Sequence, residues 1–226
     1  MDGARLKGRD HWVIALLYGF LYASLLIIIT EIIWDGVFKF TGITGLKKEI
    51  IESFFRAALL EEFFKFTGFR MADNKYRFSC KKDSMLAAGT IGLVYAVVEK
   101  VASGNLMAII LGILFPMHIL WQLNQGRHYY DYKQAKAAGE QQTKRRELFL
   151  AVPLIILIHG SWDAVISIIG YLFEESGWKS AELAGGLLTA VLVIFGVTYM
   201  VITIKRTLAV TRAAKAAEQQ KKGEIS

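Results

Sequence analysis

The 226-residue sequence contains one cysteine and two prolines. A single cysteine allows neither an internal disulfide nor a metal cluster held by thiolates, so we exclude both kinds of cross-link. We interpret Cys80 as a free thiol beside two lysines. Because proline in a helix interior removes a hydrogen bond and clashes with the preceding turn, its scarcity allows long helices to run without interruption.

The sequence also lacks any recognisable nucleic-acid-binding motif, although its formal net charge is +7. The basic residues lie between apolar runs, where lipid headgroups are the expected partner. We therefore predict no nucleic-acid partner and a bilayer with anionic headgroups on its cytoplasmic side.

Apolar residues make up 54% of the chain and gather in runs long enough to cross a membrane. About 20 helical residues, each rising 1.5 Å, span the roughly 30 Å of hydrocarbon in a bilayer. A signal peptide would have a shorter apolar core and a cleavage site of small residues, so we interpret the first run as a span. We expect an all-α, polytopic membrane bundle of about six transmembrane helices, at about residues 12–34, 49–69, 84–101, 106–123, 148–173 and 184–204.

We expect residues 1–226 to form a single integral membrane domain with its core at about 12–204. Residues 124–147 are interpreted as a charged cytoplasmic loop with some helix, and 205–226 as a charged C-terminal tail. Of the 27 Lys and Arg residues, 20 lie in the N-terminal segment, the loop at 70–83, the loop at 124–147 and the tail. Because basic residues favour the cytoplasmic side, this distribution predicts cytoplasmic termini and a location in the plasma membrane.

Three ionisable residues interrupt the second apolar run. Glu61, Glu62 and Lys65 lie within five residues of one another, among Phe and Leu. A charged residue at the centre of a membrane helix costs about 2.5 to 3.5 kcal/mol. These side chains must therefore pair with one another, face a wet cavity or take part in chemistry.

Polar residues recur four positions apart in three later runs, as Tyr95 and Glu99, His118 and Gln122, and His159 and Asp163. Residues four apart share a helix face, and charge facing lipid is unfavourable. We therefore predict one polar cavity shared by four helices. His118 would lie near the membrane surface if its helix ended at Leu123, and the alternative is that this helix continues into the polar segment.

Carboxylates beside imidazoles can hydrolyse a peptide bond. Two neighbouring carboxylates resist ionising together, so Glu61 and Glu62 could divide into a charged base that activates water and a protonated partner. His118 and His159 could stabilise an oxyanion or move protons, with Asp163 orienting His159. The histidines could instead form only interhelical hydrogen bonds.

A metal site is a further alternative for the same side chains. Its ligands would be Glu61, His118 and His159, and zinc would be the metal to test. The sequence has no HExxH spacing or other recognised zinc signature. We therefore predict that no cofactor is required, and we leave zinc open.

The series Glu61-Glu62-x-x-Lys65, aromatic-x-x-x-Glu99, His118 followed by Leu120-Trp121, and His159-Gly160-x-Trp162-Asp163 resembles the PrsW family of intramembrane proteases. This family belongs to the group that contains CAAX prenyl proteases and bacteriocin-processing enzymes. The resemblance covers about residues 50–170 and implies a polytopic membrane protease. It implies a catalytic set of Glu61, Glu62, His118 and His159, with Glu99 and Asp163 in support. Lys65 is a further supporting residue, because its spacing on the helix allows it to hold one of the two glutamates.

The sequence departs from the family pattern at three points. Tyr95 replaces the usual Phe, Lys100 stands where Asn often follows the glutamate, and no proline follows the glutamate pair. These differences affect the expected substrate more than the hydrolytic residues.

The predicted function is hydrolysis of a peptide bond in or near the bilayer, in a membrane-anchored protein substrate. The glutamic type of protease is favoured over the metal-dependent type. One alternative is a non-catalytic membrane scaffold with the same fold. Another is an ion-coupled transporter, which the lack of matching glycine-interrupted helices in the two halves disfavours. The sequence leaves the substrate's identity and the oligomeric state open.

Overall fold

The computed structural model describes residues 10–103, 116–174 and 179–223, and across these ranges it is helical with no strand, which confirms the all-α prediction. In chain order the helices are α1 (Asp10–Thr41), α2 (Gly45–Glu52), the π-helix η1 (Ser53–Leu60), α3 (Glu61–Tyr76), α4 (Lys81–Ser103), α6 (Met117–Ala137), α7 (Gln141–Ala151), α8 (Pro153–Glu174) and α9 (Lys179–Gly223).

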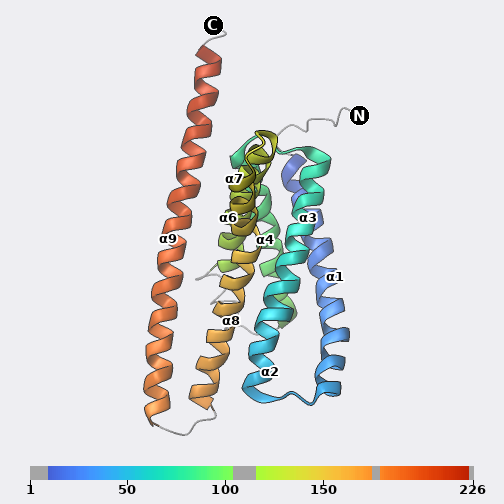
Figure 1. Cartoon of the computed structure of the whole chain (residues 1–226), viewed down its shortest axis with the longest axis vertical. Coiled ribbons are helices and arrows are strands. Elements are labelled where there is room, and N and C mark those ends of the chain that lie inside the picture. Colours follow the sequence, from blue (N-terminus) through green and yellow to red (C-terminus); the bar gives the residue numbers. More distant parts are fainter. Residues whose placement is uncertain (1–9, 104–115, 175–178, 224–226) are drawn as a thin grey trace.

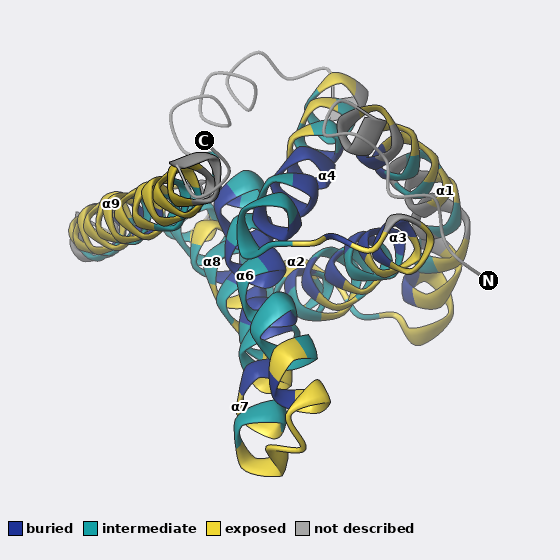
Figure 2. Ribbon diagram, turned by 90° about the horizontal axis from the view of Figure 1, so that it is seen from above, coloured by how far each residue is buried: buried dark blue, intermediate teal, exposed yellow. Residues whose placement is uncertain are grey.

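The helices run along a common long axis, and the start of α1 lies at the same end of the bundle as the end of α9 (Figure 1). Helices α2, η1 and α3 form one continuous rod beside α1. Seen from above, α9 stands at the edge of the bundle and is largely exposed (Figure 2).

Glycines allow α4 and α6 to pack closely. A Cβ atom at Gly126 would lie 2.5 Å from the backbone oxygen of Ser84, and one at Gly92 would lie 2.5 Å from that of His118. The Ser84 hydroxyl also donates a 2.8 Å hydrogen bond to the carbonyl of Gly126. Glycine at position 92 therefore allows the close approach of the two helices, and this contact fixes the height of His118 against α4.

The polar segment 124–147 is mostly helical and not an extended solvated loop. Helix α6 continues to Ala137, a turn at Gly139 follows with φ of +76°, and α7 begins at Gln141. The segment is rich in Ala, Gln and Lys, which favour helix. Because α6 continues, His118 lies at the beginning of a 21-residue helix and not near the end of one.

In the part of the chain that the structure describes, three helical stretches are long and apolar enough to cross a membrane, within Lys81–Val101, Gln141–Phe173 and Leu183–Ala217. Large exposed apolar side chains such as Phe20 on α1 and Ile194 on α9 are typical of surfaces that contact lipid. The total of six spans stays a prediction, and residues 106–115 of the expected fourth span lie outside the described residues.

Candidate active site

The candidate site begins where η1 passes into α3. Glu61 and Glu62 occupy the first turn of α3, directly after the π-helical residues 53–60. Helix α8 packs closely on η1, since a Cβ atom at Gly160 would lie 2.5 Å from the ring of Phe54. Glycine therefore allows the preceding residue, His159, to approach the glutamate pair.

Glu62 lies at the centre of a buried hydrogen-bond network and is 0% exposed. Its Oε1 accepts a 2.8 Å bond from the Lys65 ammonium and lies 3.0 Å from Nδ1 of His159. Its Oε2 accepts a 2.6 Å bond from the side-chain amide of Gln122. Residues of α3, α6 and α8 therefore hold both carboxylate oxygens.

Lys65 joins the glutamate pair to His118. Its Nζ, in a side chain only 1% exposed, lies 3.3 Å from Glu61 Oε2 and 3.0 Å from His118 Nδ1. The same ammonium lies 4.0 Å from the centre of the Tyr95 ring, within the range of a cation–π interaction. Tyr95, where the family usually has Phe, thus keeps the aromatic face that this contact needs.

His118 and Glu99 meet on the side of the site formed by α4. Nε2 of His118 lies 3.0 Å from Oε2 of Glu99, whose Oε1 is 2.9 Å from the Lys100 ammonium. The structure therefore brings Glu99 into the cluster, and Lys100 with it.

His159 faces a carboxylate with each ring nitrogen. Nδ1 faces Glu62, and Nε2 lies 3.1 Å from Asp163 Oδ2 and 4.0 Å from Glu61 Oε2. The Trp121 ring packs against the imidazole with 4.3 Å between ring centres. These contacts fix the orientation of the His159 ring.

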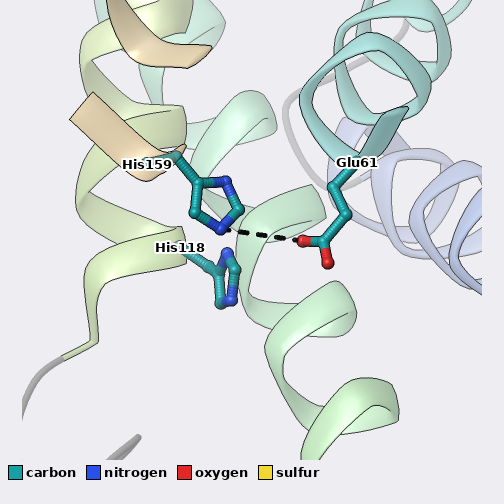
Figure 3. A group of neighbouring side chains, drawn as sticks. All are labelled: Glu61, His118 and His159. Atoms are coloured by element: carbon teal, nitrogen blue, oxygen red, sulfur yellow. Dashed lines mark ion pairs between the residues drawn. The ribbon is translucent and has the colours of Figure 1, made fainter. Parts of the chain in front are cut away.

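Glu61, His118 and His159 come from α3, α6 and α8, and each offers a ligand atom within 4.8 Å of the others (Figure 3). Glu61 and His118 are each 13% exposed at the side chain, whereas Glu62 is fully buried. Glu61 and His118 are therefore partly accessible, as are Glu99 and Asp163 at 32% and 30%, whereas Glu62 is enclosed.

The charges around the two histidines do not balance. The contacts described above place four carboxylates beside two ammonium groups, those of Glu61, Glu62, Glu99 and Asp163 beside those of Lys65 and Lys100. With all four carboxylates ionised, the excess of two negative charges would be costly inside a membrane protein. Protonation of both imidazoles would balance it, one divalent cation with neutral imidazoles would do the same, and protonation of a carboxylate would reduce it.

A family model described as PrsW family intramembrane metalloprotease matches residues 7–203. The chain belongs to this family. Protease PrsW of Clostridioides difficile (strain 630) is 27% identical over 177 residues, which covers 72% of this chain and 73% of that protein. No solved structure matches. The PrsW resemblance of the motifs is thus confirmed.

The donor set of Glu61, His118 and His159 fits the description of PrsW proteins as metalloproteases. Two histidines and one glutamate are the protein ligands of several catalytic zinc sites. A histidine that binds a metal with one ring nitrogen often donates from its other nitrogen to a carboxylate, which orients the ring. Glu62, beside Nδ1 of His159, is in the position of such a carboxylate. However, the Lys65 ammonium already lies beside Glu61 and His118, where it would repel a cation.

The sequence did not indicate which groups two residues of this cluster contact. Gln122 was placed on the face of His118 but given no partner, and its bond to Glu62 depends on a contact between α6 and α3. Trp121 was noted only as part of a motif, although its ring contacts both imidazoles. The four-residue spacing from His118 was the available signal for Gln122.

Proposed function

We propose that this protein is an endopeptidase that cleaves a membrane-anchored protein in or near the bilayer. The supporting observation is the convergence of Glu61, His118 and His159 from three helices. Membership of the PrsW family supports the same reaction class. In this proposal Glu61 acts on water, His118 and His159 act on the substrate carbonyl, and Glu62 holds His159 and Lys65 in place.

The proposed reaction follows from the placement of these groups. Glu61 Oε2 removes a proton from a water molecule, whose oxygen then attacks the carbonyl carbon of the scissile bond. An imidazole N–H of His118 or His159 exchanges its carboxylate partner, Glu99 or Asp163, for the resulting oxyanion and stabilises it. Glu61 returns the proton to the departing amide nitrogen as the C–N bond breaks, which gives a carboxylic acid and an amine; transfer of the acid's proton to the amine then leaves a carboxylate and an ammonium group.

We favour the glutamic type of protease because Lys65 already supplies a positive charge to Glu61, Glu62 and His118. If the protein instead depends on a metal, Glu61, His118 and His159 would hold it. A zinc ion there would lower the pKa of its bound water to about 7 and polarise the substrate carbonyl.

Two measurements on the purified protein test the type of protease. They are elemental analysis of active protein and cleavage assays after chelator treatment with zinc added back. The glutamic proposal predicts less than one metal ion per ten active molecules and no loss of rate with chelator. A stoichiometric metal, together with loss and recovery of activity, would overturn the glutamic type and leave the peptidase proposal intact.

The peptidase proposal is tested by co-reconstituting the protein with single-span reporter substrates. We expect cleavage by the wild type and none above background by the His159→Ala variant. Glu52→Gln is a matched control, because Glu52 is an acid on the same helical rod that pairs with Lys48 and Arg56 at a partly exposed position. It should cleave like the wild type. Stable substrate binding without cleavage by the wild type would favour the scaffold alternative.

A further inference from the structure

Gln122 is a fully buried amide aimed at the glutamate pair. It lies four residues after His118 on α6, is 0% exposed, and donates from Nε2 to Glu62 Oε2 over 2.6 Å. A donor to a carboxylate forms one of the stronger classes of protein hydrogen bond. The bond connects α6 to α3 at the height of the candidate site.

The two oxygens of Glu62 have different partners. Lys65 and His159 share Oε1, while Gln122 is the donor within 3.5 Å of Oε2 among the described contacts. Without Gln122, the carboxylate could rotate about its last bond and still keep Lys65. Its bond to Nδ1 of His159 would then lose its fixed direction.

The backbone around Gln122 is also tightly placed. A Cβ atom at Gly92 of α4 would lie 2.8 Å from Gln122 Cγ and 3.0 Å from Gln122 Cβ. Close packing against α4 thus restricts the stem of the side chain, and the amide is presented to Glu62 from a rigid position. Rigid supporting groups are what keep reacting groups in a productive geometry.

We infer that Gln122 is a positioning residue for this site: it fixes the Glu62 carboxylate, which in turn orients the imidazole of His159. This inference rests on the proposed peptidase function and deepens it. The side-chain amide of Gln122 has its described hydrogen bond with Glu62, so it acts on the imidazole of His159 through Glu62.

The kinetic test compares Gln122→Met with the wild type in the reconstituted cleavage assay. Met keeps the length of the side chain and removes the donor. We expect kcat to fall about ten- to a hundredfold, in line with other orienting groups, with KM within about twofold. An unchanged kcat in an otherwise active preparation would overturn the inference and leave the proposed function standing.

Asn124→Leu is the matched control. Asn124 is another buried amide on α6, but its Nδ2 donates to Tyr199 and Thr203 of α9. Its loss should cost stability while kcat changes less than about threefold. If Asn124→Leu lowers kcat as much as Gln122→Met does, then loss of any buried amide on α6 lowers kcat, and the inference about Gln122 fails.

A second comparison separates positioning from general structure. In the Glu62→Asp variant the shorter side chain withdraws the carboxylate from Gln122. Adding Gln122→Met to this variant should therefore lower its remaining kcat by less than about threefold. Equal losses in both backgrounds would contradict the inference.

The hydrogen bond can also be tested without turnover. Thermal unfolding of the wild type, Gln122→Met, Glu62→Gln and the double variant should show shifts that do not add, because the two side chains share one bond. Additive shifts would refute the contact on which the inference depends, even in a protein that cleaves nothing.

Discussion

Helices α3 and α6 meet at two buried polar clusters of opposite character. Near the end of α3, Asp73 pairs with Lys133 at 2.6 and 2.8 Å and accepts a 3.1 Å bond from the Phe78 amide, so one acid meets one cation. Near its start, the cluster around Glu61 has two more carboxylates than ammonium groups. The first cluster can hold helices together without further partners, whereas the second has charge available for protons, a cation or a substrate.

Among the substitutions that compare these clusters, Glu61→Gln is expected to have the largest effect. This change keeps the shape of the side chain and removes its ability to accept a proton. We expect the rate of cleavage to fall by about 10² to 10⁴, the range attributed to general bases, with little loss of thermal stability. Initial rates and unfolding temperatures of the same preparations check this. A variant that cleaves within threefold of the wild type would exclude Glu61 as the base.

The convergence of these groups was predictable because the membrane restricts where ionisable side chains can point. Glu61, His118 and His159 lie on separate helices, and facing lipid would be costly for each of them, so the spacing of polar residues in the apolar runs predicts an inward cluster. The separate environments of Glu61 and Glu62 were not predictable. Which glutamate is buried depends on the positions of Gln122 and His159 on neighbouring helices.

The fold was predictable to a similar depth. Long apolar runs imply helices, but they did not indicate the π-helical register of residues 53–60, which lie beside α8. The charge of residues 124–147 indicated solvent, whereas burial of Tyr129 and Ala135 gives these residues a packed helical hairpin. For residues 124–147, tertiary contacts decided what local composition left open.

Gly160→Ala tests whether the close approach of α8 to η1 is needed for activity of the cluster around Glu61. The added methyl group would meet the Phe54 ring at 2.5 Å, so α8 must shift or the ring must turn. We expect kcat to fall about tenfold, since small displacements of reacting groups are costly. Gly170→Ala on the same helix is the control, because no atom lies within 4 Å of its added Cβ. Equal kinetics for the two variants would show that this approach is not needed.

Asp73→Asn, in the cluster of Asp73 and Lys133, should lower stability and leave the rate of cleavage nearly unchanged, which is the reverse of Glu61→Gln. It leaves the Lys133 ammonium without its carboxylate and weakens the bond to the Phe78 amide. We expect a loss of about 1 to 3 kcal/mol in stability, with kcat changed less than about twofold. Unfolding temperatures and cleavage rates should therefore rank Asp73→Asn and Glu61→Gln in opposite orders. A large loss of kcat with unchanged stability would remove the distinction between the clusters.

The smallest effect is expected at the pair of His128 on α6 and Glu147 on α7, in which one acid faces one basic side chain. His128 Nδ1 lies 2.7 Å from Glu147 Oε2, and burial lowers the pKa of His128 below its usual value. Because the folded pKa lies below the unfolded value of about 6.5, the stabilising contribution is complete above that pH and is lost as the pH falls through the folded pKa.

His128→Gln removes this titration, and the variant should therefore gain stability relative to the wild type as the pH falls from about 7.5 to about 5. We expect the difference to change by less than about 1 kcal/mol, or about 2 to 4 °C in unfolding temperature for a chain of this size. Cleavage by the two proteins should keep the same pH profile, because His128 lies outside the cluster around Glu61. If His128→Gln instead shifted the pH profile of cleavage, the pair of His128 and Glu147 would be coupled to the cluster around Glu61 and would not be independent of it.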